Sequence, residues 1–264
     1  MPEYKKCDMC GAEILVLGRK YNTFLKREFT IVEECKNCKR LAEEKVAMEK
    51  AAITTKRAVK YLKTSNIPKR FISTTFDMLN APSPSYKKAL DRCQNYCSIA
   101  DKAMEKGYGI YIFSEEGRGK TCILSCMIKE ITKQGYSCYI DNMVSLATKL
   151  FNKTISIDYL ANVDFLFLDD IGTERYINNN GKDTWANEKI YEFINERSNQ
   201  LRPTIFSSNL DYDDLEARGL MKKTVDRIIE MSARKLEIKT DKSLRLLTKS
   251  ERENLVNKGE TNDK

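Results

Sequence analysis

The sequence contains no histidine among its 264 residues. This absence excludes serine–histidine triads, acid–base catalysis by an imidazole and metal sites with a histidine ligand. Long apolar runs are also lacking, because no stretch approaches the roughly 18 residues of a membrane span, and no signal peptide opens the chain. We therefore expect a soluble, cytoplasmic protein with no membrane partner.

The number of cysteines is odd, and the sequence shows no export signal. Nine cysteines in such a chain favour metal ligands and reduced thiols over a disulfide framework. The length of 264 residues and the hydrophobic content of 41% allow one large domain, or a domain with a small appendage.

The net charge of +8 is concentrated near the N-terminus. Residues 1–70 hold 17 Lys and Arg against 9 Asp and Glu, whereas residues 71–264 hold 29 of each kind. A basic appendage on a neutral remainder indicates an anionic partner, such as nucleic acid or an acidic protein surface. The alternative is a solvated basic face without a partner.

The stretch from Gly109 to Ile128 has the pattern of a phosphate-binding loop. Residues 110–113 predict a buried strand, the loop reads SEEGRGKT, and apolar residues then recur at helical spacing. Backbone N–H groups and the helix dipole favour an anion at the start of the helix. Lys120 can reach the β- and γ-phosphates, and the Thr121 hydroxyl can ligate Mg²⁺.

The loop departs from the usual pattern at its first glycine, which is Ser114 here. Gly117 and Gly119 keep the two positions nearest the phosphates. The alternative is a glycine-rich surface turn that precedes an ordinary helix.

An apolar run over residues 163–168 precedes two carboxylates, Asp169 and Asp170. Carboxylates at the C-terminal edge of a strand beside a phosphate loop can hold Mg²⁺ and polarise a water. We assign Asp169 to the metal and Asp170 to the water. Asn209 ends another expected strand and is placed to orient that water, although an Asp pair or an Asn at a strand end can also serve only a turn.

Two CxxC pairs, separated by 24 residues, lie near the N-terminus: Cys7 with Cys10, and Cys35 with Cys38. Two strand-like runs lie between them, as in a zinc ribbon, where four thiolates complete a closed tetrahedral site. An Fe–S cluster or four unrelated buried thiols are the alternatives. About 38 residues cannot form a core unaided, so metal binding is expected to supply folding energy.

The remaining pattern predicts an α/β fold with a parallel sheet. A helix from Arg40 to Lys63, with a break allowed near Thr54-Thr55, serves as a connector or as a partner-binding helix. A helix over residues 86–106 precedes the first strand. We expect domain borders at 1–40 for the zinc ribbon, 41–66 for the connector, 67–248 for the core and 249–264 for a polar tail.

The order of these motifs resembles the DnaC/IstB-like family of AAA+ ATPases. The segments that carry the resemblance are the loop ending GKT, then FLFLDDIGTE, RPTIFSSNL, TVDRIIE and KSLRL. They cover about residues 67–247. The N-terminal CxxC pairs look like those of the family's replicative helicase loaders.

The resemblance implies roles for individual residues. Arg227 matches an arginine finger that acts on ATP in a neighbouring subunit, with Arg218 as a competing candidate. On its own helix Arg227 can instead pair with Asp226 or Glu230. Arg245 matches a second sensor, although Leu244 precedes it where the family usually has an aromatic residue. The implied nucleotide-binding residues are Gly117, Arg118, Gly119, Lys120, Thr121, Cys122, Asp169 and Arg245.

These observations predict an ATPase with ATP, Mg²⁺ and Zn²⁺ as cofactors. It is expected to load a hexameric replicative helicase on single-stranded DNA and to form a homo-oligomer with ATP. By the resemblance, residues 143–163 correspond to the family's helix that contacts single-stranded DNA. Tyr159 is the exposed-looking aromatic of this stretch. Three alternatives stay open: a transposase helper ATPase of the same family, a P-loop small-molecule kinase, and an adaptor that no longer responds to nucleotide.

Overall fold

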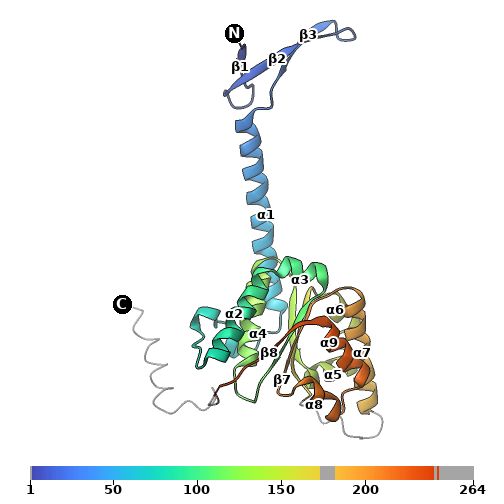
Figure 1. Cartoon of the computed structure of the whole chain (residues 1–264). Coiled ribbons are helices and arrows are strands. Elements are labelled where there is room, and N and C mark those ends of the chain that lie inside the picture. The colour runs from blue at the N-terminus through green and yellow to red at the C-terminus, as the bar shows by residue number, and fades with distance from the viewer. Residues whose placement is uncertain (1, 173–181, 241–242, 244–264) are drawn as a thin grey trace. The chain divides into compact units, whose positions relative to one another are not determined.

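The structure is a computed structural model, which describes residues 2–172, 182–240 and 243 (Figure 1). The chain divides into two compact units, Met1–Lys56 and Arg57–Lys264, and the border falls within helix α1 (Lys36–Thr64). We call them the N-terminal and C-terminal units. None of the helices in the described part of the chain combines the length and apolar character that crossing a bilayer requires.

The N-terminal unit contains a three-stranded antiparallel sheet in the order β1-β2-β3. Its strands are β1 (Tyr4–Lys6), β2 (Glu13–Asn22) and β3 (Arg27–Val32). Within the described residues 2–56, only Cys7 and Ile14 are buried. Two buried side chains cannot offset the conformational entropy of ordering this unit, so its fold needs another source of stability.

Helix α1 differs from the expected connector in two ways. It begins at Lys36, which places Cys38 in its first turn, and it continues through Thr54-Thr55 without a break. The Thr55 hydroxyl donates a 2.9 Å hydrogen bond to the Ala51 carbonyl, a geometry that an intact helix accommodates. The prediction that the helix can break near Thr54-Thr55 is therefore wrong. The predicted domain borders stay a prediction.

The C-terminal unit is built on a five-stranded sheet in the order β5-β6-β7-β4-β8, and every neighbouring pair is parallel. The predicted α/β class with a parallel sheet is confirmed. The strands are β4 (Gly109–Phe113), β5 (Cys138–Asn142), β6 (Phe165–Ile171), β7 (Thr204–Ser208) and β8 (Ser232–Glu237).

Helices cover both faces of this sheet, which explains its continuous apolar strands. On β6, Phe165 and Phe167 face one core cluster, and Leu166 and Leu168 face the other. The first cluster includes residues of α2 (Pro84–Ser98), α3 (Ala100–Lys106) and α4 (Lys120–Lys133). The second includes residues of α5 (Met143–Phe151), α6 (Ile157–Asn162), α7 (Lys182–Asn199), α8 (Tyr212–Ala217) and α9 (Lys222–Met231).

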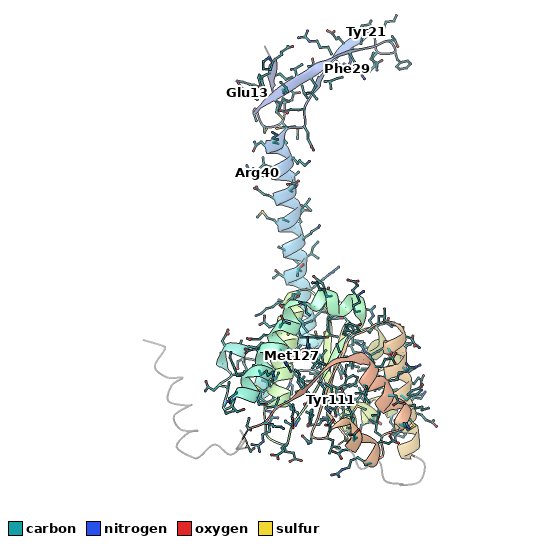
Figure 2. The ribbon with its side chains drawn as sticks, in the orientation of Figure 1. Glu13, Tyr21, Phe29, Arg40, Tyr111 and Met127 are labelled. Atoms are coloured by element: carbon teal, nitrogen blue, oxygen red, sulfur yellow. The ribbon has the colours of Figure 1, made fainter. Side chains whose placement is uncertain are left out.

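Figure 2 shows Met127 on α4 and Tyr111 on β4, and both are fully buried. The helix expected over residues 86–106 is divided at Ile99 into α2 and α3. Two 3₁₀ turns, Lys69–Phe71 and Phe76–Met78, precede α2.

Candidate functional site

The predicted phosphate loop connects β4 to α4, as its sequence context requires. Gly117 has φ of 75° and Gly119 has φ of 84°, and Gly119 is the N-cap of α4. Residues with a side chain rarely adopt such backbone angles, so both positions favour glycine. Ser114 is not among the described residues with positive φ. The first loop position thus tolerates serine because its backbone does not need the freedom of glycine.

The Lys120 side chain points into this loop and is 5% exposed. Its ammonium group donates hydrogen bonds to the Ser114 carbonyl at 2.9 Å and to the Glu115 carbonyl at 3.2 Å. It also donates to Oδ1 of Asn209 at 2.5 Å. A lysine held in this way is ready to meet phosphate oxygens at the start of a helix.

The acidic pair lies at the end of β6, beside this lysine. Oδ2 of Asp169 accepts a 2.6 Å hydrogen bond from the Thr121 hydroxyl, and Asp169 is buried. Mg²⁺ prefers hard oxygen ligands such as a hydroxyl and a carboxylate. The pair Thr121 and Asp169 therefore fits a magnesium ion that accompanies a nucleotide. Asp170 is half-buried and has φ of 53°.

Asn209 follows β7, which is the neighbour of β6 in the sheet. The structure thus brings Lys120, Thr121, Asp169 and Asn209 together at the C-terminal edge of the strands. This edge is where ligands bind in open parallel sheets.

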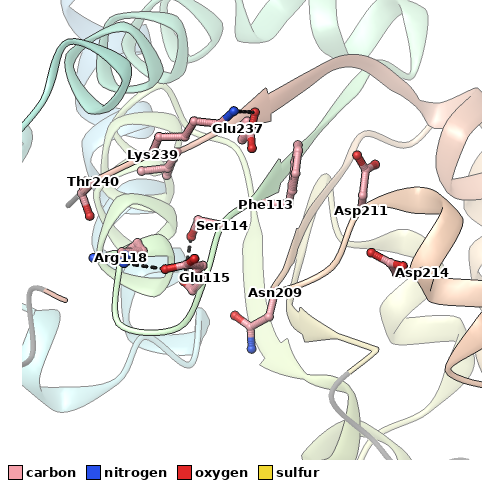
Figure 3. Close-up of a pocket in the computed structure, with 11 residues that line it drawn as sticks. Phe113, Ser114, Glu115, Arg118, Asn209, Asp211, Asp214, Glu237, Lys239 and Thr240 are labelled. Atoms are coloured by element: carbon pink, nitrogen blue, oxygen red, sulfur yellow. Dashed lines mark hydrogen bonds and ion pairs between the residues drawn. The ribbon is translucent and has the colours of Figure 1, made fainter. Parts of the chain in front are cut away.

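A cavity of about 630 Å³ opens beside the loop (Figure 3). Arg118 lines it, with a side chain that is 11% exposed and that pairs with Glu115 at 2.5 Å. Within the described part of the chain, Nη1 of Arg118 is buried without a hydrogen-bond partner. The lining residues are Phe113, Ser114, Glu115, Arg118, Asn209, Asp211, Asp214, Glu237, Ile238, Lys239 and Thr240.

Cys122 lies in the first turn of α4 but does not line this cavity. Its thiol faces Cys126, and the hydrogen bond between the two lowers the pKa of Cys122. Its assignment to nucleotide binding stays a prediction.

The three arginines implied by the resemblance differ in their surroundings. Arg227 lies on α9 and is ion-paired with Glu230, which raises its pKa. Arg218 is exposed at the C-cap of α8. Arg245 lies outside the described residues. The pairing of Arg227 within its own helix is thus present, and its action on a second subunit stays a prediction.

The four N-terminal cysteines converge, and their sulfur atoms all lie within 4.8 Å of one another. Sγ of Cys7 is 3.6 Å from Cys38, and Sγ of Cys10 is 3.4 Å from Cys35. Four thiolates at Zn–S distances of about 2.3 Å have sulfur–sulfur separations of roughly 3.8 Å. Hydrogen bonds from the Ala12 backbone, and then from the side chains of Asn37 and the neighbouring cysteines, lower the pKa of Cys10 to about 6, which favours its thiolate. The donor set fits Zn²⁺.

The sequence pattern does not reveal that Arg197 positions two strands. Its only signal is that it follows Ile190 and Ile194 at helical spacing. It is completely buried on α7, and burial lowers its pKa to about 9. Its guanidinium donates to Oγ1 of Thr204 at 2.9 Å. It also donates to the carbonyls of Leu160, Ala161, Val163, Asp164 and Pro203. Arg197 thereby ties the entrance of β6 to the start of β7.

No model of a known protein family matches the chain. Among curated proteins, it is 25% identical over 168 residues to the replicative helicase loader DnaI of Bacillus subtilis (strain 168). That match covers 61% of this chain and 52% of DnaI. The chain therefore spans about half the length of the curated relatives it matches.

Among solved structures, a DnaC helicase loader superposes with a TM-score of 0.56 at 26% identity, over 65% of this chain and 100% of that one. AMPPCP-bound DnaA from Aquifex aeolicus superposes with a TM-score of 0.52 at 19% identity, over 73% of this chain and 56% of that one.

With the strand order and the loop, these likenesses define the class: the C-terminal unit has the α/β P-loop fold of AAA+ proteins. Within that class, the chain is similar in sequence to the helicase loader DnaI and in structure to a DnaC helicase loader. The resemblance inferred from its motifs is confirmed.

Proposed function

We propose that this chain is an ATPase that loads a hexameric replicative DNA helicase on single-stranded DNA. The observation that carries the proposal is the convergence of Lys120, Thr121, Asp169 and Asn209 at one strand edge, in a homologue of helicase loaders. The AMPPCP in the DnaA structure with the same fold supports a nucleotide at this edge.

Each residue has a defined role in the proposed reaction. The N–H groups at the start of α4 and the Lys120 ammonium hold the phosphates. Thr121 and Asp169 hold Mg²⁺, which neutralises charge on the phosphate oxygens when bound. Asp170 accepts a proton from the attacking water, and Asn209 orients that water. Arg227 of a neighbouring copy stabilises charge on the transferring group, which requires a homo-oligomer.

The bond between Lys120 and Asn209 suggests how the nucleotide acts as a switch. The γ-phosphate and Asn209 compete for the same ammonium group. Binding or loss of this phosphate thus changes the partners of the residue that follows β7. A change at β7 is transmitted through the sheet to the helices packed on it.

We propose that the N-terminal unit is a structural zinc module that holds the helicase. Zn²⁺ supplies the stability that two buried side chains do not. Its β2–β3 hairpin carries Tyr21 (Figure 2) and Phe24, which are 63% and 91% exposed. Exposed aromatics on a basic module suit an acidic protein surface with apolar pockets.

We assign the binding of single-stranded DNA to residues 143–163 of the C-terminal unit. Val144, Phe151 and Tyr159 are 56%, 61% and 41% exposed there. The Tyr159 ring packs edge-on against Tyr139, with centroids 5.6 Å apart. A half-exposed, braced aromatic is suited to base stacking.

Helicase transfer to DNA tests the proposal directly. The purified chain and a replicative helicase are incubated with circular single-stranded DNA and ATP, and helicase on the DNA is quantified after gel filtration. Wild type is expected to raise the bound helicase, and Lys120→Ala to leave it at the level without loader. If ATP does not change the amount of helicase on the DNA and the chain binds a transposase, the chain is a transposase helper and not a helicase loader. Phosphate transfer to a small acceptor instead indicates a kinase.

A further inference from the structure

The ladder between β6 and β7 is interrupted at the acidic pair. Strand pairing runs regularly from Leu166 to Leu168 and shifts register before Ile171. Asp169 and Asp170 occupy this irregularity, and Asp170 has φ of 53°. Side chains must therefore replace some of the backbone hydrogen bonds that the interrupted ladder does not supply.

Ser207 on β7 supplies one such bond, to the backbone of Asp170, and makes a second bond to the side chain of Asp169. It is completely buried. Its hydroxyl donates to Oδ1 of Asp169 and accepts a 3.2 Å hydrogen bond from the backbone N–H of Asp170. One hydroxyl thus contacts both residues of the acidic pair.

The two oxygens of Asp169 consequently have separate holders. Oδ1 is held by Ser207 from β7, and Oδ2 accepts its hydrogen bond from Thr121 on α4. A carboxylate fixed at both oxygens cannot rotate freely about its terminal bond. The orientation it presents toward Thr121 is therefore set in advance.

We propose that Ser207 is a positioning residue that sets the Asp169 carboxylate for the magnesium ion bound with the nucleotide. The inference rests on the proposed nucleotide function. Ser207 does not touch the nucleotide; it acts through Asp169 and through the backbone of Asp170. Its removal leaves the buried Oδ1 of Asp169 and the N–H of Asp170 without this partner. The contribution of Mg²⁺ to nucleotide binding then falls.

The next residue provides a matched control. Ser208 is also completely buried on β7, and its hydroxyl donates to the Ile171 carbonyl at 2.6 Å and accepts from the Leu210 N–H at 3.0 Å. Both serines brace the same irregularity, but only Ser207 contacts a carboxylate in these hydrogen bonds. Ser207→Ala and Ser208→Ala therefore separate positioning of Asp169 from general support of the fold.

The experiment measures the affinity of the full chain for a fluorescent, non-hydrolysable ATP analogue, with MgCl₂ and with EDTA. We define the Mg²⁺ gain as the ratio of these two affinities. Ser207→Ala is expected to keep the wild-type affinity in EDTA. Its Mg²⁺ gain is expected to be roughly tenfold smaller than that of wild type, as for other residues that orient a metal ligand. Ser208→Ala is expected to keep the gain. Ser207→Thr, which retains the hydroxyl and suits a strand, is expected to restore it.

Thermal unfolding of each variant is recorded in parallel. If Ser207→Ala does not fold, Ser207→Cys, which keeps the size but bonds weakly, is judged by the same ratio. A Mg²⁺ gain for the Ser207 variant equal to that of wild type overturns this inference alone, as does an equal loss in Ser208→Ala. Wild-type protein that gains nothing from Mg²⁺, or does not bind the analogue, overturns the proposed nucleotide function as well.

Discussion

Lys120 and Asn209 lie 89 positions apart in the chain, and the Lys120 ammonium donates a 2.5 Å hydrogen bond to Oδ1 of Asn209. This contact joins the loop after β4 to the end of β7. The two strands are neighbours in the sheet and run parallel, so their C-terminal ends meet at the same edge. The lysine proposed to hold the phosphates and the asparagine proposed to orient the water are thereby in direct contact.

Lys120→Ala is expected to abolish nucleotide binding. The substitution removes the ammonium group that is proposed to hold the phosphates, while the backbone donors remain. Affinity for a fluorescent ATP analogue is the measurement. Lys133→Ala, on the same helix but exposed and paired with Glu130, is the control and is expected to bind normally. Equal affinity of Lys120→Ala and wild type would show that the nucleotide lies elsewhere.

Asp170→Asn is expected to bind ATP normally and to stop hydrolysis. The backbone of residue 170 has φ of 53°, a conformation that asparagine adopts readily, so the substitution removes charge with little strain. Phosphate release under saturating ATP is measured beside analogue binding. Turnover at the wild-type rate would contradict the division of roles between Asp169 and Asp170.

Arg227→Ala is expected to bind ATP normally and to hydrolyse it poorly, by roughly 10³-fold, if its guanidinium acts in a neighbouring site. Mixing Arg227→Ala with Lys120→Ala should then restore some hydrolysis, because one subunit brings an intact site and the other brings the arginine. Near-normal turnover and a small change in stability are expected if Arg227 serves only its pair with Glu230.

Arg218→Ala is tested in the same mixture. Complementation by Arg218→Ala and not by Arg227→Ala would assign the finger to Arg218. Absence of complementation in both would remove the support for hydrolysis between two subunits.

Cys35→Ser is expected to unfold the N-terminal unit and to leave the C-terminal unit folded. One thiolate of four is lost, and outside the four cysteines the described N-terminal residues bury only Ile14. Elemental analysis should give one zinc per wild-type chain and a loss in the variant, while analogue binding persists. Cys93→Ser, a buried thiol outside the cluster, is the control for metal content. Wild-type protein with iron, or without stoichiometric metal, would refute the zinc site.

Arg197→Met is expected to lower the free energy of unfolding by at least about 3 kcal/mol, because several buried carbonyls lose the hydrogen bonds that the guanidinium donates. Urea denaturation is the measurement. Arg202→Ala removes a partly exposed pair with Asp164 at 2.9 Å and should cost about 1 kcal/mol or less. Similar losses for the two variants would show that the buried contacts of Arg197 carry little stability.

The sequence by itself determined the local elements and the class of site. Short continuous apolar runs identify β4 and β6 as strands buried on both faces, because successive side chains point to opposite faces of the sheet and both faces are covered. The spacing of Gly117, Gly119 and Lys120 identifies the loop for a similar reason: the backbone angles required are local. The two CxxC pairs likewise predict a metal site through spacing and donor chemistry.

Only the tertiary structure decided which distant groups share a contact. Ser207 reads as one more residue of an apolar strand, and its contact with Asp169 exists because β7 lies beside β6 and the ladder slips there. Arg197 follows the buried Ile190 and Ile194 at helical spacing, but that spacing does not reveal the carbonyls from two other segments that surround its guanidinium. Such contacts depend on strand order and on register, which bring together residues far apart in the chain. Local periodicity along one strand does not show which strands become neighbours or where a ladder slips.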